Sequence, residues 1–157
     1  PTMPAGFNEF DKSDSSPMDV EKIASLIPHR YPFLQIDYVS KINGPHVTAV
    51  KNVTAEEPAF RRYADGYSVL TASIQPEILA QAGAIIMLSN EANRGKLAYF
   101  MAIDHAEFLK PVLPGDQLVL EVDIPETKSR FGKGEGFINV DGEAIAKINM
   151  MFALVDP

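Results

Sequence analysis

The sequence predicts an α+β protein in which one long, buried helix is wrapped by a curved antiparallel sheet. Three observations lead to this fold class. Residues 73–90 are apolar nearly all round, as expected of a helix enclosed on most faces. Two strand candidates and a long loop precede this segment. Several strand candidates, separated by turn signals, follow it.

Length and composition are typical of one globular domain. The chain has 157 residues, and 46% of them are hydrophobic, which is enough for a single core. Residues 1–16 are polar and rich in Gly, Pro and Ser, so they predict a flexible tail. We therefore expect a single domain over residues 17–157.

Charge and the lack of cysteine exclude several classes of function. The formal net charge of −7 argues against nucleic acid or an anionic membrane as a partner. Without cysteine there is no thiol nucleophile, disulfide framework or cysteine-based metal site, and we expect neither a metal nor a cofactor. No run reaches the roughly 18–20 apolar residues of a membrane span. The start lacks signal-peptide character, and we expect a cytoplasmic protein.

The first half of the chain predicts a short helix, two strands and a loop. Ser16 is the expected helix cap, with Pro17 at the first helical position and Pro28 as the stop. Residues 33–40 and 46–53 predict two strands, joined by a turn at residues 43–45 that reads Asn-Gly-Pro. Residues 54–71 show no clear period and predict a long loop.

The long helix predicted over residues 73–90 carries the most specific local signals. Thr71 or Ser73 can cap it, and a proline in its first turn is tolerated. Gly83 lies among alanines, so one face is small enough for another element to approach closely. Glu77 and Gln81 are the polar groups near its start, and their i, i+4 spacing places them on one face.

The second half of the chain predicts an antiparallel run of strands. The turn signals are Pro-Gly-Asp at residues 114–116 and Asp-Gly at residues 141–142. Gly132, Gly134 and Gly136 lack a following helix, so they indicate a bulged or mobile hairpin rather than a nucleotide site. The strand candidates are residues 97–103, 106–110, 117–126, 136–140 and 143–155.

Four stretches resemble the FabZ-type β-hydroxyacyl-carrier-protein dehydratases. They run in family order over nearly the whole predicted domain, so the resemblance implies the hot-dog fold, a long central helix wrapped by a curved antiparallel sheet. The stretches are IPHRYPFL at residues 27–34 with Ile36 and Asp37, KNVT at 51–54 with Glu57, Pro58 and Phe60, EILAQA at 77–82, and Ile103 to Phe108 with KPVLPGDQL at 110–118.

The resemblance also implies a reaction and its site. The family eliminates water from 3-hydroxyacyl thioesters in fatty-acid or polyketide-type metabolism. A loop histidine removes the C2 proton, and a carboxylate on the central helix protonates the leaving hydroxyl. By position, Glu77 corresponds to that carboxylate. Gln81 either positions Glu77 or a water molecule, or makes only a buried hydrogen bond. Gly66, Ala72, Ser73 and Gln81 are the positions expected to bind substrate, and backbone N–H groups at the helix start polarise the thioester carbonyl.

The catalytic loop departs from the family pattern. Counting back fourteen residues from Glu77 reaches Tyr63 instead of the family histidine, and the H-F-P motif reads Tyr63-Ala64-Asp65. Gly66 is kept, but the P-G pair before the helix is Thr71-Ala72. A tyrosine phenol, with an ordinary pKa of about 10, keeps its proton at pH 7, whereas an imidazole of about 6.5 is largely a free base. We therefore expect a homodimer to dehydrate poorly, with Tyr63 filling space or lining the acyl tunnel.

Three functions remain open from the sequence. The first is a divergent dehydratase or hydratase acting on acyl-carrier-protein or CoA thioesters, with a variant in which a histidine-bearing homologue completes the site. The second is a hot-dog acyl thioesterase in which Glu77 activates water. The third is a non-catalytic subunit that binds an acyl chain or a carrier protein. The resemblance implies a dimer, either a homodimer or a heterodimer, and is compatible with a hexamer.

Overall fold

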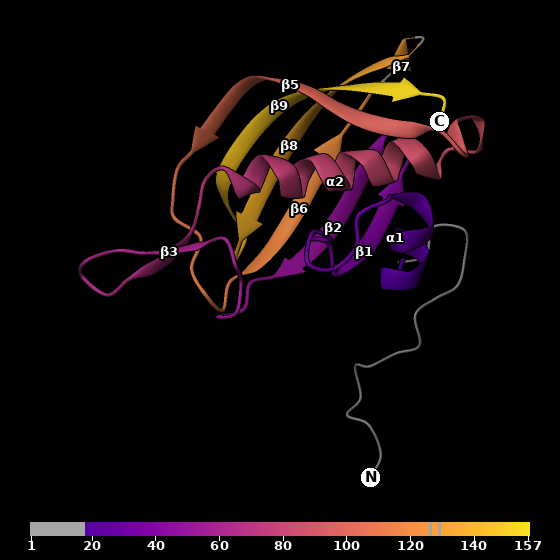
Figure 1. Ribbon diagram of the computed structural model, residues 1–157. Helices are drawn as coiled ribbons and strands as arrows, with labels where there is room; N and C mark the ends of the chain where they lie inside the picture. Colours follow the sequence, from indigo (N-terminus) through magenta and orange to yellow (C-terminus); the bar gives the residue numbers. More distant parts are fainter. Residues whose placement is uncertain (1–17, 126, 129) are drawn as a thin grey trace.

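The computed structural model describes residues 18–125, 127–128 and 130–157 (Figure 1). The predicted tail over residues 1–16, and with it the expected cap Ser16 and Pro17, lies outside the described residues. The elements in chain order are α1 Val20–Leu26, β1 Tyr38–Asn43, β2 His46–Asn52, β3 Phe60–Arg62, β4 Ser68–Leu70, α2 Ile74–Ser89, the 3-10 helix η1 Glu91–Asn93, β5 Leu97–Phe108, β6 Gln117–Asp123, β7 Thr127–Lys128, β8 Phe131–Val140 and β9 Glu143–Val155.

One curved antiparallel sheet wraps the long helix α2, which confirms the predicted architecture (Figure 1). The strand order is β1-β2-β6-β8-β9-β5, with β7 paired to β8. The inner strands alternate buried and exposed residues, as β6 shows, because successive side chains of a strand point to opposite faces. The strands β3 and β4 form a separate two-stranded hairpin.

The helix α2 is the centre of the core. Its apolar side chains are buried on nearly every face, as their all-round distribution predicts. A Cβ on Gly83 would lie 2.6 Å from Cζ of Phe152 in β9, so the predicted close approach to the small helix face is confirmed. A Cβ on Gly136 would lie 3.1 Å from Cδ1 of Leu79, so this glycine lets β8 lie directly against the helix.

The predicted boundaries fail mainly where strands are short or irregular. The loop expected over residues 54–71 contains the β3–β4 hairpin, whose three-residue strands are too short to show a period. The strands expected at 97–103 and 106–110 are one strand, β5, because register shifts at 100/102 and 103/105 interrupt its alternation. The glycine triplet expected in a hairpin lies within β8.

Local hydrogen bonds explain the remaining boundary differences. The first strand begins at Tyr38 rather than at residue 33, because Phe33 N–H and Leu34 N–H donate to the Arg30 carbonyl in a turn. The short helix begins at Val20 and is capped by the Asp19 side chain, which accepts a hydrogen bond from Lys22 N–H at 2.8 Å. Among the described helices, none combines the length and the apolar character needed to span a bilayer.

Candidate active site

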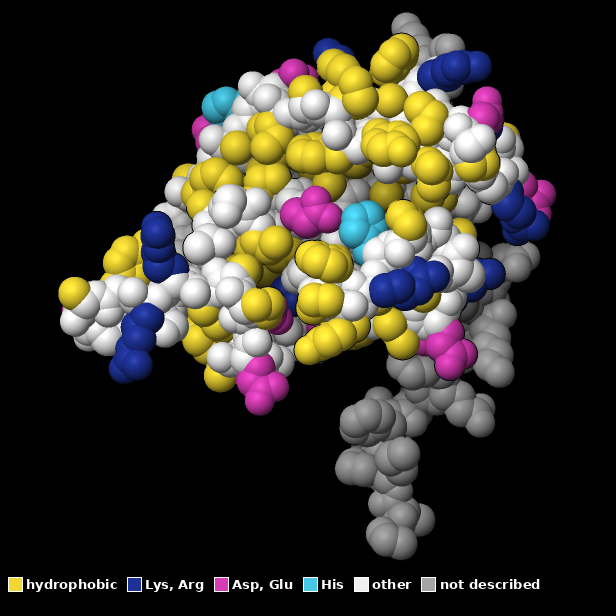
Figure 2. Space-filling model, in the orientation of Figure 1, with side chains coloured by type: hydrophobic (Ala, Val, Ile, Leu, Met, Phe, Trp, Pro, Cys, Tyr) yellow, Lys and Arg dark blue, Asp and Glu magenta, His cyan; other side chains and the backbone are white. Residues whose placement is uncertain are grey.

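Glu77 lies in the first turn of α2, at the edge of a cavity of about 440 Å³. The cavity is mainly apolar, with walls from α2, from β5 and from Phe152 of β9. The Glu77 side chain is 40% exposed, so it can reach a ligand in the cavity. In Figure 2 an acidic side chain and a histidine adjoin in the middle of this face, surrounded by hydrophobic side chains. A mainly apolar cavity with few polar groups is typical of a small-molecule site.

Gln81 holds Glu77 through a network that reaches the backbone. Gln81 Nε2 donates to Glu77 Oε1 at 2.9 Å and to the Phe33 carbonyl at 2.8 Å. Gln81 Oε1 accepts from Gln35 N–H at 2.8 Å. The side chain is fully enclosed, with 1% of the residue exposed. The i, i+4 spacing in the sequence therefore corresponds to a direct contact, and what Gln81 contributes to a reaction stays a prediction.

His29 is the member of this cluster that the sequence did not single out. Its Nε2 lies 3.3 Å from Glu77 Oε1, and both residues line the same cavity. The guanidinium of Arg30 fixes the segment by donating to the carbonyls of Ala24 and Ile27 at the end of α1. His29 and Glu77 are 48 positions apart in the chain, so their spacing carries no signal of this contact, which depends on how α1 packs on α2.

Tyr63 lies on the β3–β4 hairpin, apart from Glu77. The hairpin is closed by bonds from Tyr63 N–H to the Tyr67 carbonyl and from Gly66 N–H to the Tyr63 carbonyl. Gly66 has a φ of +89°, which a residue with a side chain rarely adopts. Tyr63 is 53% exposed and lines a second hollow of about 260 Å³ with Ala72 and Gln75. Figure 1 shows the hairpin projecting away from the sheet, so one chain does not bring Tyr63 and Glu77 into one cavity.

The start of α2 carries the other predicted substrate contacts. Ala72 and Ser73 are both exposed, and Ala72 borders the Tyr63 hollow. Ser73 occupies the N-cap position without capping the helix, because its Oγ bonds only to Thr71 Oγ1, at 3.4 Å, among the described residues. Ile74 N–H and Gln75 N–H donate to Thr71 and Ala72 carbonyls in a tight turn. The roles of Gly66, Ala72 and Ser73 toward a substrate remain predictions.

The strand β5 forms an exposed apolar edge beside the Glu77 cavity. It is the last strand of the sheet order and pairs with β9 along one side only, as far as the described residues show. Tyr99, Met101 and Ile103 on it are 53%, 56% and 43% exposed. Figure 2 shows hydrophobic side chains gathered over this strand. Exposed apolar patches and open sheet edges mark surfaces for another chain.

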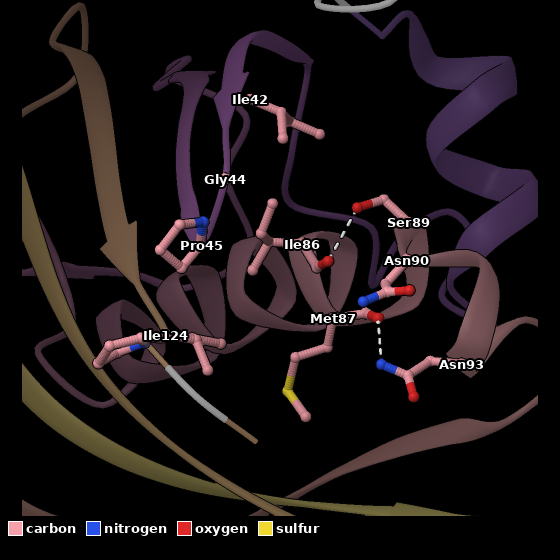
Figure 3. Close-up of a pocket in the computed structure, with 10 residues that line it drawn as sticks. Ile42, Gly44, Pro45, Ile86, Met87, Ser89, Asn90, Asn93 and Ile124 are labelled. Atoms are coloured by element: carbon pink, nitrogen blue, oxygen red, sulfur yellow. Dashed lines mark hydrogen bonds between the residues drawn. The ribbon is translucent and has the colours of Figure 1, made fainter. Parts of the chain in front are cut away.

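The largest hollow lies at the opposite end of α2 and offers no acid or base. It has a volume of about 730 Å³ between the β1–β2 turn and the end of the helix (Figure 3). Its polar side chains bond within the fold: Ser89 Oγ donates to the Ile86 carbonyl, and Asn93 Nδ2 donates to the Met87 carbonyl. None of the residues that line it is titratable, so this hollow offers no group for proton transfer.

Within the described part of the chain, no three His, Asp or Glu side chains are grouped as a metal site would need. The pKa of Lys147 is raised by its hydrogen bond to Glu135 and by the charge of that carboxylate. Lys147 lies on β9 away from the cavity residues, so this shift does not bear on the site.

Comparison with known proteins identifies relatives over most of the chain. The model of the FabA-like domain family matches residues 27–149. The 3-hydroxyacyl-[acyl-carrier-protein] dehydratase FabZ of Geobacillus sp. WCH70 is 46% identical over 140 residues, 88% of this chain and 97% of that protein. The protein of the same name from Bacillus subtilis is 44% identical over 138 residues, 87% and 98% of the two chains.

Two solved structures show the same fold at low sequence identity. One is described as the dehydratase heterocomplex ApeI:P from Xenorhabdus doucetiae, with a TM-score of 0.72, 18% identity and coverage of 85% of this chain and 91% of that chain. The other is a hypothetical thioesterase with coenzyme A from Streptococcus pneumoniae, with a TM-score of 0.61, 13% identity and coverage of 75% and 84%. At these identities the likeness shows the hot-dog fold alone.

Proposed function

Because this chain belongs to the FabA-like family and is 44–46% identical to two FabZ dehydratases over most of its length, we propose that it dehydrates 3-hydroxyacyl thioesters. The curated relatives are named for substrates on acyl carrier protein, and we propose a carrier-protein or CoA thioester as the substrate here. The single observation that carries the proposal is Glu77, held by Gln81 at the edge of an apolar cavity that suits an acyl chain.

The reaction needs two proton transfers. A base takes the C2 proton, the C3–O bond breaks, and the departing hydroxyl takes a proton and leaves as water, which gives the 2-enoyl thioester. We assign to Glu77 the proton transfer to the departing hydroxyl. A carboxyl group can donate this proton in dehydration and accept it in the reverse reaction, hydration. Tyr63 cannot replace the family histidine as a ready base, because a phenol is an acid at neutral pH.

We propose further that a partner subunit completes the Glu77 site. Two observations support a dimer: Tyr63 and Glu77 of one chain line different cavities, and β5 presents an exposed apolar edge next to Glu77. In a homodimer the partner would bring a phenol to the site. In a heterodimer a histidine-bearing homologue would bring the missing base, and we expect this form to be the more active. A structural neighbour described as a dehydratase heterocomplex is consistent with such pairing.

The thioesterase alternative rests on the same carboxylate. With no imidazole in the loop, Glu77 could activate water for attack on the thioester carbonyl, which would release a free thiol and a fatty acid. A structural neighbour described as a hypothetical thioesterase is consistent with this alternative. A non-catalytic binding subunit is the third outcome that the following experiment separates.

The experiment follows 3-hydroxyacyl and 2-enoyl thioesters, on carrier protein and on CoA, with the chain alone and mixed with a histidine-bearing FabZ. Interconversion without thiol release, lost in Glu77→Gln, supports the dehydratase. Glu91→Gln is the matched control, because Glu91 is exposed on η1 at the far end of α2. Thiol release that depends on Glu77 would instead establish the thioesterase. Binding without either product would leave only the binding subunit.

A further inference from the structure

Two side chains converge on one oxygen of Glu77. Gln81 Nε2 lies 2.9 Å and His29 Nε2 lies 3.3 Å from the same atom, Oε1. The orientation of Gln81 is fixed by backbone groups, since its Oε1 faces the Gln35 N–H and its Nε2 faces the Phe33 carbonyl. An N–H can only donate and a carbonyl can only accept, so Gln81 must present a donor to Glu77.

The surroundings of His29 select its tautomer. Its Nδ1 is buried, and no described residue or backbone group bonds to it. A hydrogen on that nitrogen would be an unsatisfied buried donor, which is more costly than an unused lone pair next to apolar atoms. On the other side of the ring, Nε2 faces a carboxylate oxygen, which needs a donor. Both considerations place the hydrogen of the neutral ring on Nε2, pointing at Glu77.

We propose that His29 is a positioning residue for Glu77. The Gln81 amide donates a hydrogen bond to Oε1 and His29 Nε2 lies within ion-pair distance of the same oxygen, so Oε2 is left to exchange a proton with the substrate. His29 is therefore not a substitute for the missing loop histidine, because its Nε2 carries a hydrogen and its Nδ1 is enclosed. The catalytic part of this inference rests on the proposed function, and the contact itself does not.

The catalytic test compares two substitutions of His29. The His29→Phe variant keeps an aromatic ring but loses the N–H donor. The His29→Gln variant places an amide N–H close to the position of Nε2. We expect His29→Phe to lower kcat roughly ten- to hundredfold with little change in KM, because a misplaced carboxylate mainly affects the transition state. His29→Gln should retain most of the activity. Equal losses in both variants, or a loss confined to KM, would overturn the positioning role.

A second measurement does not depend on activity. The ¹⁵N shifts of the imidazole nitrogens report the tautomer of each of the three histidines, and His29→Gln assigns the signal by its disappearance. We expect the neutral ring of His29 to carry its hydrogen on Nε2, and Glu77→Gln to shift its signals while the exposed His105 stays unchanged. A hydrogen on Nδ1 would refute the inference. If the tautomer is as expected but no thioester is turned over, the proposed function fails and the contact stands.

Discussion

The Glu77 cavity and the Tyr63 hairpin, which we propose to be the two halves of the site, are built in opposite ways. Around Glu77, four segments meet: α2, the chain after α1, the strand β5 and Phe152 of β9. Gln81 there is 1% exposed and has three hydrogen-bond partners. Around Tyr63, two strands of three residues form a hairpin in which Tyr63 and Tyr67 are more than half exposed.

This difference explains where the sequence departs from the family. A substitution beside Glu77 would disturb buried groups whose hydrogen bonds depend on each other. A substitution on the exposed hairpin removes few contacts, so the proposed replacement of the family motif by Tyr63-Ala64-Asp65 is compatible with an intact core. The carboxylate half is organised by the fold of its own chain, and we propose that a partner subunit completes the hairpin half.

The largest expected effect is on the core that supports Glu77. Phe152 is 1% exposed, fills the space over Gly83 and contacts the ring of Phe100 at a centroid distance of 5.8 Å. We expect Phe152→Ala to lower the free energy of unfolding by about 3–5 kcal/mol, through lost burial and a cavity. Denaturant titration measures this change. A loss below about 1 kcal/mol would mean that this core does not fix the carboxylate half.

The second effect is a gain of activity at the hairpin. We expect Tyr63→His to raise the hydration of a 2-enoyl thioester by the homodimer about tenfold or more, because an imidazole restores a base near neutral pH. Tyr63→Gln is the matched control, since it has similar polarity but no basic nitrogen. An equal response of the two variants would show that the loop residue does not face the reacting atoms, and Ala72 would then be the next position to change.

The smallest expected effect is on stability at the same position. Tyr63→Ala should change the free energy of unfolding by no more than about 0.5 kcal/mol, because the side chain is exposed and the hairpin is held by backbone bonds. The same denaturant titration provides the comparison with Phe152→Ala. A loss of about 2 kcal/mol or more would remove the distinction between the two halves.

Of the two proposed halves of the site, the sequence predicts the one that lies on the regular helix α2. The all-round apolar segment defines α2, and the i, i+4 spacing places Glu77 and Gln81 on one face of it. The hairpin, the continuity of β5 and the His29 contact were missed. Short strands have no period to detect, bulges break the alternation of β5, and the His29 contact joins segments that are remote in the chain.

The most direct test of a divided site is complementation between two variants of this chain. The double variant Tyr63→His/Glu77→Gln offers an imidazole but no carboxylate, and the wild-type chain offers Glu77 but no loop imidazole. Each is expected to hydrate a 2-enoyl thioester poorly alone. After the two are unfolded and refolded together, mixed dimers should combine Glu77 of one subunit with the imidazole of the other, and activity should rise well above the sum of the separate samples. If mixed dimers form and the activity does not exceed that sum, the two halves do not meet across a subunit interface.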